Sequence, residues 1–437
     1  ADLPGALALA ASVVASPAPG GAPRLLLVGG LPAVTLGDAM DAEVSRLGPP
    51  ATADPATAVA AAYWLSGNGS AAVAEGVPSR FAAGAASFET PEGSVVGIAG
   101  GITYEGGQAV VSDQFQIVEF TAAGVVVREP VTLKTPRIAP RVVALPDKRV
   151  FIVIGGGVQT GGFTDLDTLR NLVEIVPLAP PVARGVAVTI SIPPGTSEEI
   201  LALVGPSAWP SVVLTDDNHL VVIGGFALDG PVILDTARAL PVAYRLQIGA
   251  TTPTSMVLDT PAAWAEPGMV NLFARTLPMR VTTPSDVFLS GGFGIPQTPE
   301  KPRQDALQID RATGGVSVSV DVPYFAIGSA SVPFSDGSSV VSGGLVESGS
   351  ANQLAVTNFS ALRAGGGLDN CVPVALDGDE PEDAGEDVPP ADLPPADLPM
   401  PPMGDVDLDT PGDVADAPGD VPIADGGDPD ANMDAGQ

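Results

Sequence analysis

The segment HLVVIGGF, residues 219–226, contains a pattern that recurs along this chain and indicates its fold. Four apolar residues run directly into two glycines, and another apolar residue follows. The other copies of the pattern are LLLVGG (25–30), SVVGIAGG (94–101), VFIVIGGG (150–157), DVFLSGGF (286–293) and SSVVSGGL (338–345). Each copy is typical of a short buried strand that ends at a sharp backbone feature. Their recurrence predicts a fold that is built from repeats.

The spacing of the copies indicates what kind of repeat they form. From Gly29 to Gly343, the first glycines of the outermost copies, the five intervals average about 63 residues. This period is too long for ankyrin or tetratricopeptide units, and it leaves room for four short strands with their loops. The composition agrees, because the chain has 52 glycines and 46 prolines and only 16% of its residues are charged. We therefore expect an all-β fold.

Further apolar runs flank the glycine pairs and complete each repeat. The runs expected to form first strands are LALAASVVA (7–15), FAAGAASF (81–88), RVVALPD (141–147), PSVVLTDD (210–217), LFARTLP (272–278) and IGSASVPFSD (327–336). The runs expected to form third and fourth strands are FQIVEF (115–120), GVVVREPVTL (124–133), LVEIV (172–176), GVAVTISI (185–192), VAYRLQI (242–248), SMVLDTP (255–261), ALQID (306–310), VSVSVDV (316–322), LAVTNF (354–359) and VPVAL (372–376). AAAYWLSG (60–67) is expected to be the outer strand of the first repeat. Four strands in each of six repeats predict a β-propeller.

These units, and segments such as DALQIDRATGGVSVSV (305–320), resemble the kelch family and the wider galactose-oxidase-like propellers. The resemblance covers about residues 6–376 and implies a six-bladed kelch-like β-propeller. The chain lacks the tyrosine and tryptophan that follow the glycines in kelch repeats, since Trp64, Trp209 and Trp264 do not recur at one repeat position. A neighbouring propeller family is therefore the alternative. The copper site of the galactose-oxidase type is not supported, because the chain has one histidine and one cysteine.

The glycine pairs themselves have two interpretations. A phosphate-binding loop would need a helix N-terminus after the glycines, and usually a lysine, but no helical periodicity follows the pairs. Glycine also permits positive φ angles and close approach of two backbones, which converging propeller blades would require. We therefore expect a structural role for the repeat glycines, which are Gly29, Gly30, Gly100, Gly101, Gly155, Gly156, Gly224, Gly225, Gly291, Gly292, Gly343 and Gly344.

The composition changes sharply after the repeats. Residues 377–437 contain 19 acidic residues, 12 prolines and no lysine, arginine or aromatic residue. Such a segment buries too little apolar surface to offset the entropy lost on ordering. We therefore expect a propeller over 1–376 and a disordered, acidic, low-complexity tail over 377–437. The tail resembles the linkers of exported bacterial surface proteins, and its ADLP motif also stands at 1–4, which suggests a similar linker upstream.

The tail contains DVDLDTPGDVAD, residues 405–416, with carboxylates spaced as D-x-D-x-D-x-x-x-D-x-x-D. Calcium takes roughly six to eight oxygen ligands in a flexible geometry, so closely spaced carboxylates suit it. The spacing resembles thrombospondin type-3 and EF-hand-like loops, although Thr410 stands where an EF-hand has glycine. Chance spacing in an aspartate-rich tail is the competing interpretation. The candidate calcium ligands are Asp405, Asp407, Asp409, Asp413 and Asp416.

We expect no catalytic residues. His219 is the only histidine, which excludes a histidine cluster, and no G-x-S-x-G motif accompanies it. We expect His219 to be a turn or strand-edge residue. A glycosidase would need two loop carboxylates that converge on one site. The acidic residues in predicted loops, which we expect to be solvated, are Asp165, Asp167, Glu198, Glu199, Asp216 and Asp217.

The charge and the single cysteine restrict the partners. A net charge of −32 argues against nucleic acid, because phosphate binding needs a cationic surface. Cys371 is the only cysteine, so no intrachain disulfide can form, and no apolar run reaches the ~18 residues of a membrane span. We expect an extracellular or cell-surface bacterial protein, a non-catalytic scaffold that binds a protein or glycan or assembles with itself. No cofactor other than calcium is expected. The alternatives are a structural subunit of a surface filament or layer, and a carbohydrate-active enzyme using loop carboxylates.

Overall fold

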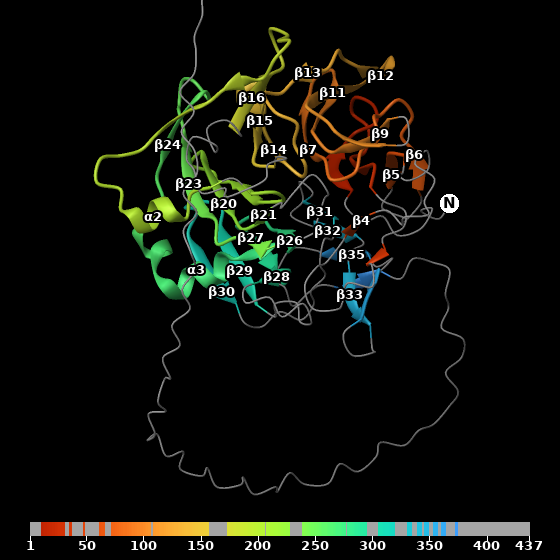
Figure 1. Ribbon diagram of the computed structural model, residues 1–437. Coiled ribbons are helices and arrows are strands. Elements are labelled where there is room, and N and C mark those ends of the chain that lie inside the picture. Colours follow the sequence, from red (N-terminus) through yellow and green to blue (C-terminus); the bar gives the residue numbers. More distant parts are fainter. Residues whose placement is uncertain are drawn as a thin grey trace, which may run out of the picture. The chain divides into compact units, whose positions relative to one another are not determined.

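The computed structural model describes the chain in segments (Figure 1). The described residues are 10–30, 61–65, 71–105, 108–156, 173–205, 207–227, 238–276, 278–294 and 305–319, together with the strands at 35–36, 47–48, 330–333, 339–342, 345–348, 353–356, 360–363 and 372–374. All of them lie in the first of the two units into which the chain divides, Ala1–Glu380. The tail over 377–437, which contains the candidate calcium ligands, lies outside the described residues. The glycine pair at 343–344 also lies outside them.

The fold is all-β, as predicted, and its main units are small antiparallel sheets. The first sheet consists of β1 (Ala11–Ala15), β2 (Arg24–Val28), β5 (Tyr63–Leu65) and β6 (Ala71–Val73). The second consists of β7 (Gly84–Thr90), β8 (Gly93–Ala99), β11 (Gln114–Thr121) and β12 (Gly124–Val127), and β13 (Val131–Thr132) also pairs with β11. The third consists of β14 (Arg141–Leu145), β15 (Val150–Ile154), β16 (Val173–Pro177) and β17 (Val186–Ala187).

The same order of strands continues along the chain. The fourth sheet consists of β19 (Ser211–Leu214), β20 (His219–Ile223), β23 (Ala243–Ile248) and β24 (Ser255–Leu258), and β18 (Thr189–Ser191) pairs with β24 in parallel. The fifth consists of β26 (Met279–Thr282), β27 (Asp286–Ser290), β29 (Ala306–Asp310) and β30 (Val316–Ser319). Strands β31 (Ala330–Pro333), β32 (Ser339–Ser342), β35 (Ser360–Arg363) and β36 (Val372–Val374) pair in the same succession.

Short elements connect these strands. Two-stranded ribbons stand between the second and third strands of several sheets, and they are β3 (Thr35–Leu36) with β4 (Leu47–Gly48), β9 (Ile102–Glu105) with β10 (Gln108–Val111), β21 (Phe226–Ala227) with β22 (Arg238–Ala239), and β33 (Leu345–Ser348) with β34 (Gln353–Val356). A further ribbon pairs β25 (Arg275–Thr276) with β28 (Phe293–Gly294). The helical elements are η1 (Pro146–Lys148), α2 (Glu198–Ala202), η2 (Ala262–Ala265) and α3 (Pro267–Phe273). Within the described segments, no helix has the length and apolar character that crossing a membrane requires.

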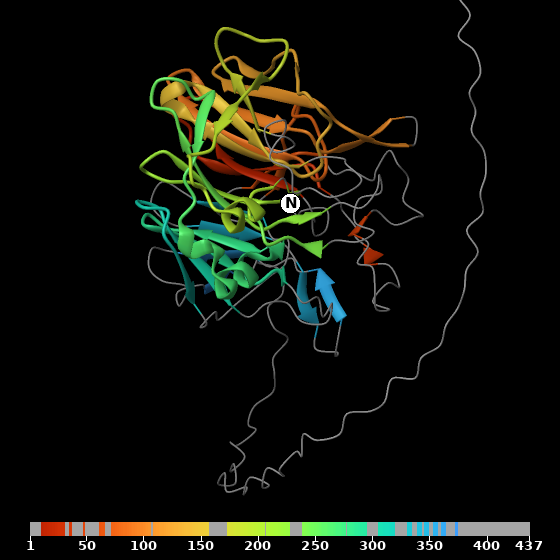
Figure 2. The same ribbon diagram turned by 60° about the vertical axis from the view of Figure 1, so that its left-hand side comes forward.

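The sheets follow one another in a ring, in the manner of a β-propeller (Figures 1 and 2). The first strand of each sheet contacts the first strand of the next, from β1 to β7, from β7 to β14 and from β14 to β19. A hydrogen bond of 3.0 Å from Arg280 Nη1 on β26 to the carbonyl of Val212 on β19 joins the fourth and fifth sheets. The predicted β-propeller class is therefore confirmed in its general form, a ring of small antiparallel sheets.

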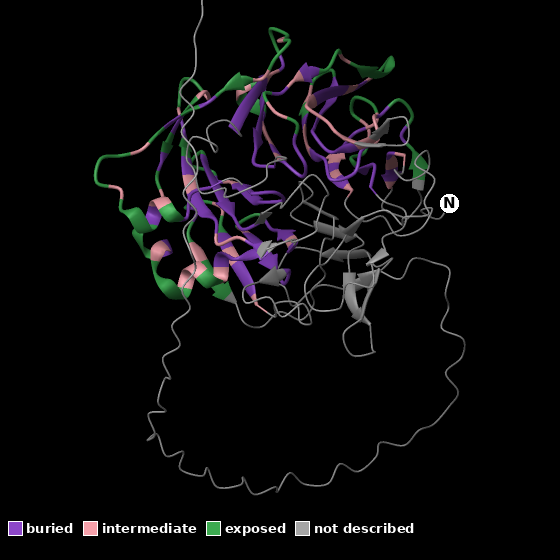
Figure 3. Cartoon of the chain, in the orientation of Figure 1, coloured by how far each residue is buried: buried purple, intermediate pink, exposed green. Residues whose placement is uncertain are grey.

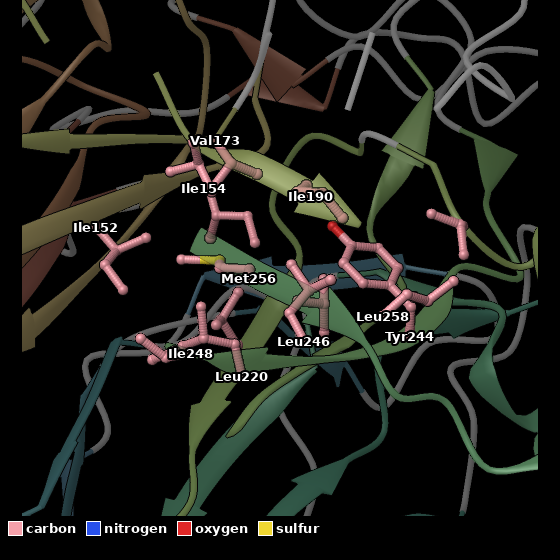
Figure 4. Close-up of a cluster of buried hydrophobic side chains, with 14 of the residues drawn as sticks. Ile152, Ile154, Val173, Ile190, Leu220, Tyr244, Leu246, Ile248, Met256 and Leu258 are labelled. Atoms are coloured by element: carbon pink, nitrogen blue, oxygen red, sulfur yellow. The ribbon is translucent and has the colours of Figure 1, made fainter. Parts of the chain in front are cut away.

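The core consists of apolar side chains packed between neighbouring sheets. Figure 3 shows that the central strands of the sheets are mostly buried. On β15, Phe151 and Val153 pack toward the second sheet, whereas Ile152 and Ile154 pack toward the fourth. Because the strand is buried on both faces, its sequence is a continuous apolar run and not an alternating one. Figure 4 shows the cluster between the third and fourth sheets, where the ring of Tyr244 lies among aliphatic side chains.

Four segments differ from their predicted roles. Residues 272–278 do not form the first strand of the fifth sheet, because α3 extends to Phe273 and β26 takes that position. Residues 354–359 overlap β34, which pairs only with β33, and β35 is the third strand. Residues 185–192 divide into β17 and β18, which belong to different sheets. Residues 60–67 contain β5, the third strand of the first sheet, and β6 is the outer one.

Candidate functional site

The glycine pairs end the second strand of each sheet in a conformation that side chains rarely adopt. In HLVVIGGF, φ is +66° at Gly224 and +95° at Gly225. The pairs after β2, β8, β15 and β27 also have two consecutive positive φ angles, and all the values lie between 59° and 100°. Glycine adopts this conformation without strain because it has no Cβ.

The glycine pairs of the first four sheets also touch the backbone of the next sheet. A Cβ on Gly224 would lie 2.2 Å from the carbonyl oxygen of Arg275, and the N–H of Gly225 donates to that oxygen at 2.8 Å. In the other three sheets the second glycine donates at 2.8 to 3.2 Å to the carbonyls of Arg80, Arg137 and Ser207. We call each of these a glycine–carbonyl contact. They join each sheet to the next where the second strand ends.

In each glycine–carbonyl contact, the residue that supplies the carbonyl also forms a hydrogen bond through its side chain. Nη1 of Arg80 donates at 3.1 Å to the carbonyl of Gly100, which belongs to the glycine pair of its own sheet. Bonds of 2.7 to 3.4 Å join Arg137 to Gly155, Ser207 to Gly224 and Arg275 to Gly291 in the same way. Each of these residues therefore links two successive glycine pairs, one through its backbone and one through its side chain.

A phosphate would find no free N–H at the pair in HLVVIGGF. The N–H of Gly224 donates to the carbonyl of Val242 at 2.7 Å, and that of Gly225 donates to Arg275. The repeat pattern identifies the glycines from the sequence, but it does not identify their partners. Arg80, Arg137 and Arg275 each lie four residues before the first strand of their sheet, as Ser207 does. Aligning the repeats on that strand would have placed three arginines at one position.

A cluster of charged side chains surrounds His219, the first residue of β20. Its Nδ1 lies 2.9 Å from Oδ1 of Asp217, and its Nε2 lies 3.1 Å from Oδ2 of Asp259. Nη2 of Arg245 on β23 donates at 2.6 Å to Oδ2 of Asp259. We call these four residues the His219 cluster. The imidazole is 8% exposed, and both of its nitrogens face carboxylates.

The carboxyl of Asp217 is held in its ionised form. Burial acts to raise the pKa of Asp217, but hydrogen bonds from Thr215 and His219 and the charges of His219 and Arg245 lower it below its ordinary value. A glycosidase needs a general acid whose pKa is raised. Asp217 therefore suits an ion pair within the fourth sheet and not proton donation to a glycoside.

The lowered pKa of Asp217 makes its contribution to stability depend on pH. A carboxyl whose pKa is depressed on folding stabilises the folded state above its unfolded pKa, about 3.9, and loses that effect as the pH falls through its folded pKa. Asp217→Asn should therefore lower the melting temperature at pH 7, and the difference should disappear once the pH is below the folded pKa of Asp217. Scanning calorimetry of both proteins over this range measures the difference. Thr215→Val, which removes one of the hydrogen bonds to Asp217, should show a smaller effect of the same sign. An equal loss at both pH values would contradict the assignment.

The other predicted loop acids contact protein groups or lie at the surface. Glu198 and Glu199 form the first turn of α2 and are exposed. Hydrogen bonds from its own backbone N–H and from Ser197 lower the pKa of Glu199. Asp216 lies 3.6 Å from the guanidinium of Arg311. Two further predicted acids, Asp165 and Asp167, lie outside the described residues. In the part of the chain that is described, no group of three or more metal-ligating side chains is gathered.

The outer strands of the sheets expose apolar side chains. On β12, Val125, Val126 and Val127 are 41%, 44% and 42% exposed. β12 is the end strand of the second sheet, so one of its edges has no strand partner among the described residues. Single exposed valines lie on the fourth strands of the other four sheets, and they are Val73 on β6, Val186 on β17, Val257 on β24 and Val318 on β30. β24 differs from the other three because β18 pairs with its outer edge.

Comparison with known proteins adds no family to these observations. No protein-family model matches the sequence, and no curated protein matches it. The features that bear on function are therefore those of the chain itself, namely the glycine–carbonyl contacts, the His219 cluster and the exposed valines.

Proposed function

We propose that the chain is a non-catalytic scaffold that binds an extended segment of a partner protein along β12. The observation that carries this proposal is the run of three exposed valines beside an unpaired strand edge. Successive residues of a strand point to opposite faces, so the exposure of all three leaves both faces of β12 uncovered. A strand added to such an edge forms hydrogen bonds with the free backbone N–H and C=O groups of the edge, and it covers the exposed valine side chains.

The ring presents β12 on a rigid support. β12 pairs with β11 from Val118↔Val127 to Thr121↔Gly124, and β11 pairs in turn with β8. Phe115 and Phe120 of β11 are fully or almost fully buried in the packing with the neighbouring sheets. A preorganised edge loses little conformational entropy when a partner binds, which favours binding.

The chemistry of β12 favours a protein partner over a glycan. β-Branched apolar side chains complement another strand, whereas they offer no hydrogen bonds to sugar hydroxyls. The charge of Arg128, next to β12, is compensated by its ion pair with Glu119, and Glu129 follows directly. With a net charge of −32 on the whole chain, the complementary partner is an apolar strand flanked by lysine or arginine.

A designed peptide tests this function directly. Fluorescence anisotropy would measure binding of a labelled Lys-Val-Thr-Val-Thr-Val-Lys peptide to the complete chain and to Val126→Lys. A lysine on an exposed edge repels a cationic strand and interrupts its apolar contact, so affinity should fall about tenfold or more. A peptide with proline at its centre should not bind, because proline lacks the N–H that strand addition needs.

Val73→Lys is the matched control, because it places the same charge on the exposed outer strand of another sheet. It should bind the peptide as the unchanged protein does. Equal affinity for the unchanged protein and Val126→Lys would overturn docking on β12. Light scattering would identify the remaining candidate occupant. A dimer that becomes a monomer in Val126→Lys would mean that a second copy covers the edge, as a filament or layer subunit requires.

We further propose that the ring contains six kelch-like blades. Support comes from β31, which begins a set of four paired strands and contacts β26 on one side and β1 on the other. A blade in this place would close the ring between the fifth and first sheets. A crystal structure would test the number of blades.

The place of the protein in the cell is also a proposal. The acidic, proline-rich composition of 377–437 supports an exported or cell-surface protein of bacterial type, in which this segment is a linker or a weak calcium ligand. Calorimetric titration of the complete chain with calcium, compared with a chain that ends at residue 376, would test the second role. Equal calcium binding by both chains would contradict it.

A further inference from the structure

The two faces of β12 are turned toward different parts of the molecule. Residues that lie opposite each other on paired strands have their side chains on the same face of the sheet. Val125 lies opposite Phe120 on β11, and Phe120 belongs to the core cluster between the first and second sheets. Val127 lies opposite Val118, which belongs to the same cluster. The side chains of Val125 and Val127 are therefore on the face that is turned toward the first sheet.

A turn of the first sheet reaches this face of β12. The turn contains Glu75 and Gly76, and its flanking residues Ala74 and Val77 are buried in the core cluster between the first and second sheets. A Cβ on Gly76 would lie 3.8 Å from Cγ1 of Val125. The backbone of the turn therefore stands close to β12, and Glu75 lies on the same side of the strand as Val125.

The two faces of β12 also differ in charge. Glu75 is exposed, and it forms no ion pair with any residue that the structure describes. On the other face, Val126 lies opposite Glu119, whose carboxylate forms an ion pair with Arg128. A cation on a partner strand would therefore find a carboxylate without a counter-charge beside the first-sheet face, whereas the carboxylate on the other face already has one.

We propose that Glu75 selects the strand that binds to β12, and that this strand carries lysine or arginine on the same face as its apolar residues. The inference rests on the proposed docking of a strand along β12, and it specifies the partner. Side chains of an added strand alternate between the two faces, so those beside Val125 and Val127 cover these valines when they are apolar. A lysine two positions further along the strand stays on that face, and its flexible four-carbon stem lets its charge approach Glu75.

Two peptides of identical composition test this inference. In Lys-Thr-Val-Thr-Val-Thr-Lys, the lysines and valines share one face of the strand, whereas in Thr-Lys-Val-Thr-Val-Lys-Thr they stand on opposite faces. We call them the same-face and the split-face peptide. Fluorescence anisotropy with the complete chain should show about threefold tighter binding of the same-face peptide, the effect of a partly exposed ion pair. Glu75→Gln should remove this difference.

Reversal of the charges separates selection from a role in folding. Glu75→Lys should bind the same-face peptide about fivefold more weakly than the unchanged protein does, because like charges then meet. Glu-Thr-Val-Thr-Val-Thr-Glu should show the opposite order, with tighter binding to Glu75→Lys than to the unchanged protein. A residue that only maintained the fold would weaken the binding of both peptides when it is replaced.

Glu198→Gln is the matched control, because Glu198 is an exposed acidic residue on α2, which precedes the fourth sheet. It removes the same charge and should leave both affinities unchanged. Val73→Lys remains a control for β12 as well. Trp64 packs on Phe120, and Val73 lies on the opposite face of its sheet from Trp64.

The outcomes distinguish this inference from the proposed function. Equal binding of the same-face and split-face peptides to the unchanged protein, or a difference that persists in Glu75→Gln, would overturn the role of Glu75. Docking on β12 would still stand in that case if Val126→Lys weakens the binding of both peptides. If neither peptide binds, or if Val126→Lys changes neither affinity, the proposed function and the role of Glu75 are both wrong.

Discussion

Replacing Gly224 with alanine should destabilise the protein by about 4 kcal/mol or more. The new Cβ would lie 2.2 Å from the carbonyl oxygen of Arg275, which belongs to the backbone of the next sheet and cannot rotate away. The backbone would also be held at φ +66°, which costs a residue with a side chain about 1–2 kcal/mol. Any shift that relieves the contact breaks the hydrogen bond from Gly225 to Arg275. Urea unfolding followed by circular dichroism measures the loss.

Gly20→Ala measures the cost of backbone strain in the absence of a steric clash. Gly20 has the same φ of +66°, but a Cβ there would meet no atom within 4 Å. Its substitution should therefore cost only the conformational strain, about 1–2 kcal/mol. Equal losses for the two variants would show that the close approach between sheets does not matter. A ligand-binding role for the pair predicts a different result, in which Gly224→Ala keeps its stability.

Glu174→Gln should destabilise the protein by about 3–5 kcal/mol, because it removes the negative charge that faces a buried arginine. The side chains of Arg137 and Glu174 form an ion pair in the third sheet, and both are 0% exposed. Glu174 also accepts hydrogen bonds from the backbone N–H of Lys134 at 3.1 and 3.2 Å. Burial lowers the pKa of Arg137, and the charge of Glu174 opposes this effect. The measurement is urea unfolding, because urea does not screen charges.

Glu119→Gln provides the comparison. Glu119 forms an ion pair with Arg128, and the two side chains are 20% and 31% exposed. Partly exposed pairs contribute about 0–1 kcal/mol, so this variant should remain close to the unchanged protein. Similar losses in the two variants would mean that burial does not decide the strength of the Arg137–Glu174 pair. Replacing both Arg137 and Glu174 with methionine should recover part of the stability that Glu174→Gln loses.

The propeller class could be predicted because each repeat contains its own local signal. The run FIVI before Gly155 is apolar at every position, and β15 is indeed buried on both faces. The glycine pair that follows has two positive φ angles, which few other residues could adopt. Strand length, burial on two faces and the sharp end of the strand are local properties.

Local signals failed where a segment could form more than one structure. The apolar run at 272–278 suits either a helix or a strand. Pro267 begins α3, a favourable first position for proline, and Phe273 packs on Trp264 with ring centroids 5.3 Å apart. The helix therefore covers the core on this side, and the strand begins only at Met279. Similarly, no sequence pattern within residues 185–192 indicates that β18 pairs with a strand of the next sheet.

The all-β class, the repeated strand that ends in two glycines and the change of composition at the tail can all be predicted from the sequence, because each depends on residues that are neighbours in the chain. Which side chains meet depends on how the strands and sheets pack in the folded protein. Asp259 meets His219 from a position 40 residues away in the sequence, because β20, β23 and β24 pair within the fourth sheet. Arg141 and Arg280 donate to the carbonyls of Pro210 and Val212 because the ring places the third and fifth sheets on either side of the fourth.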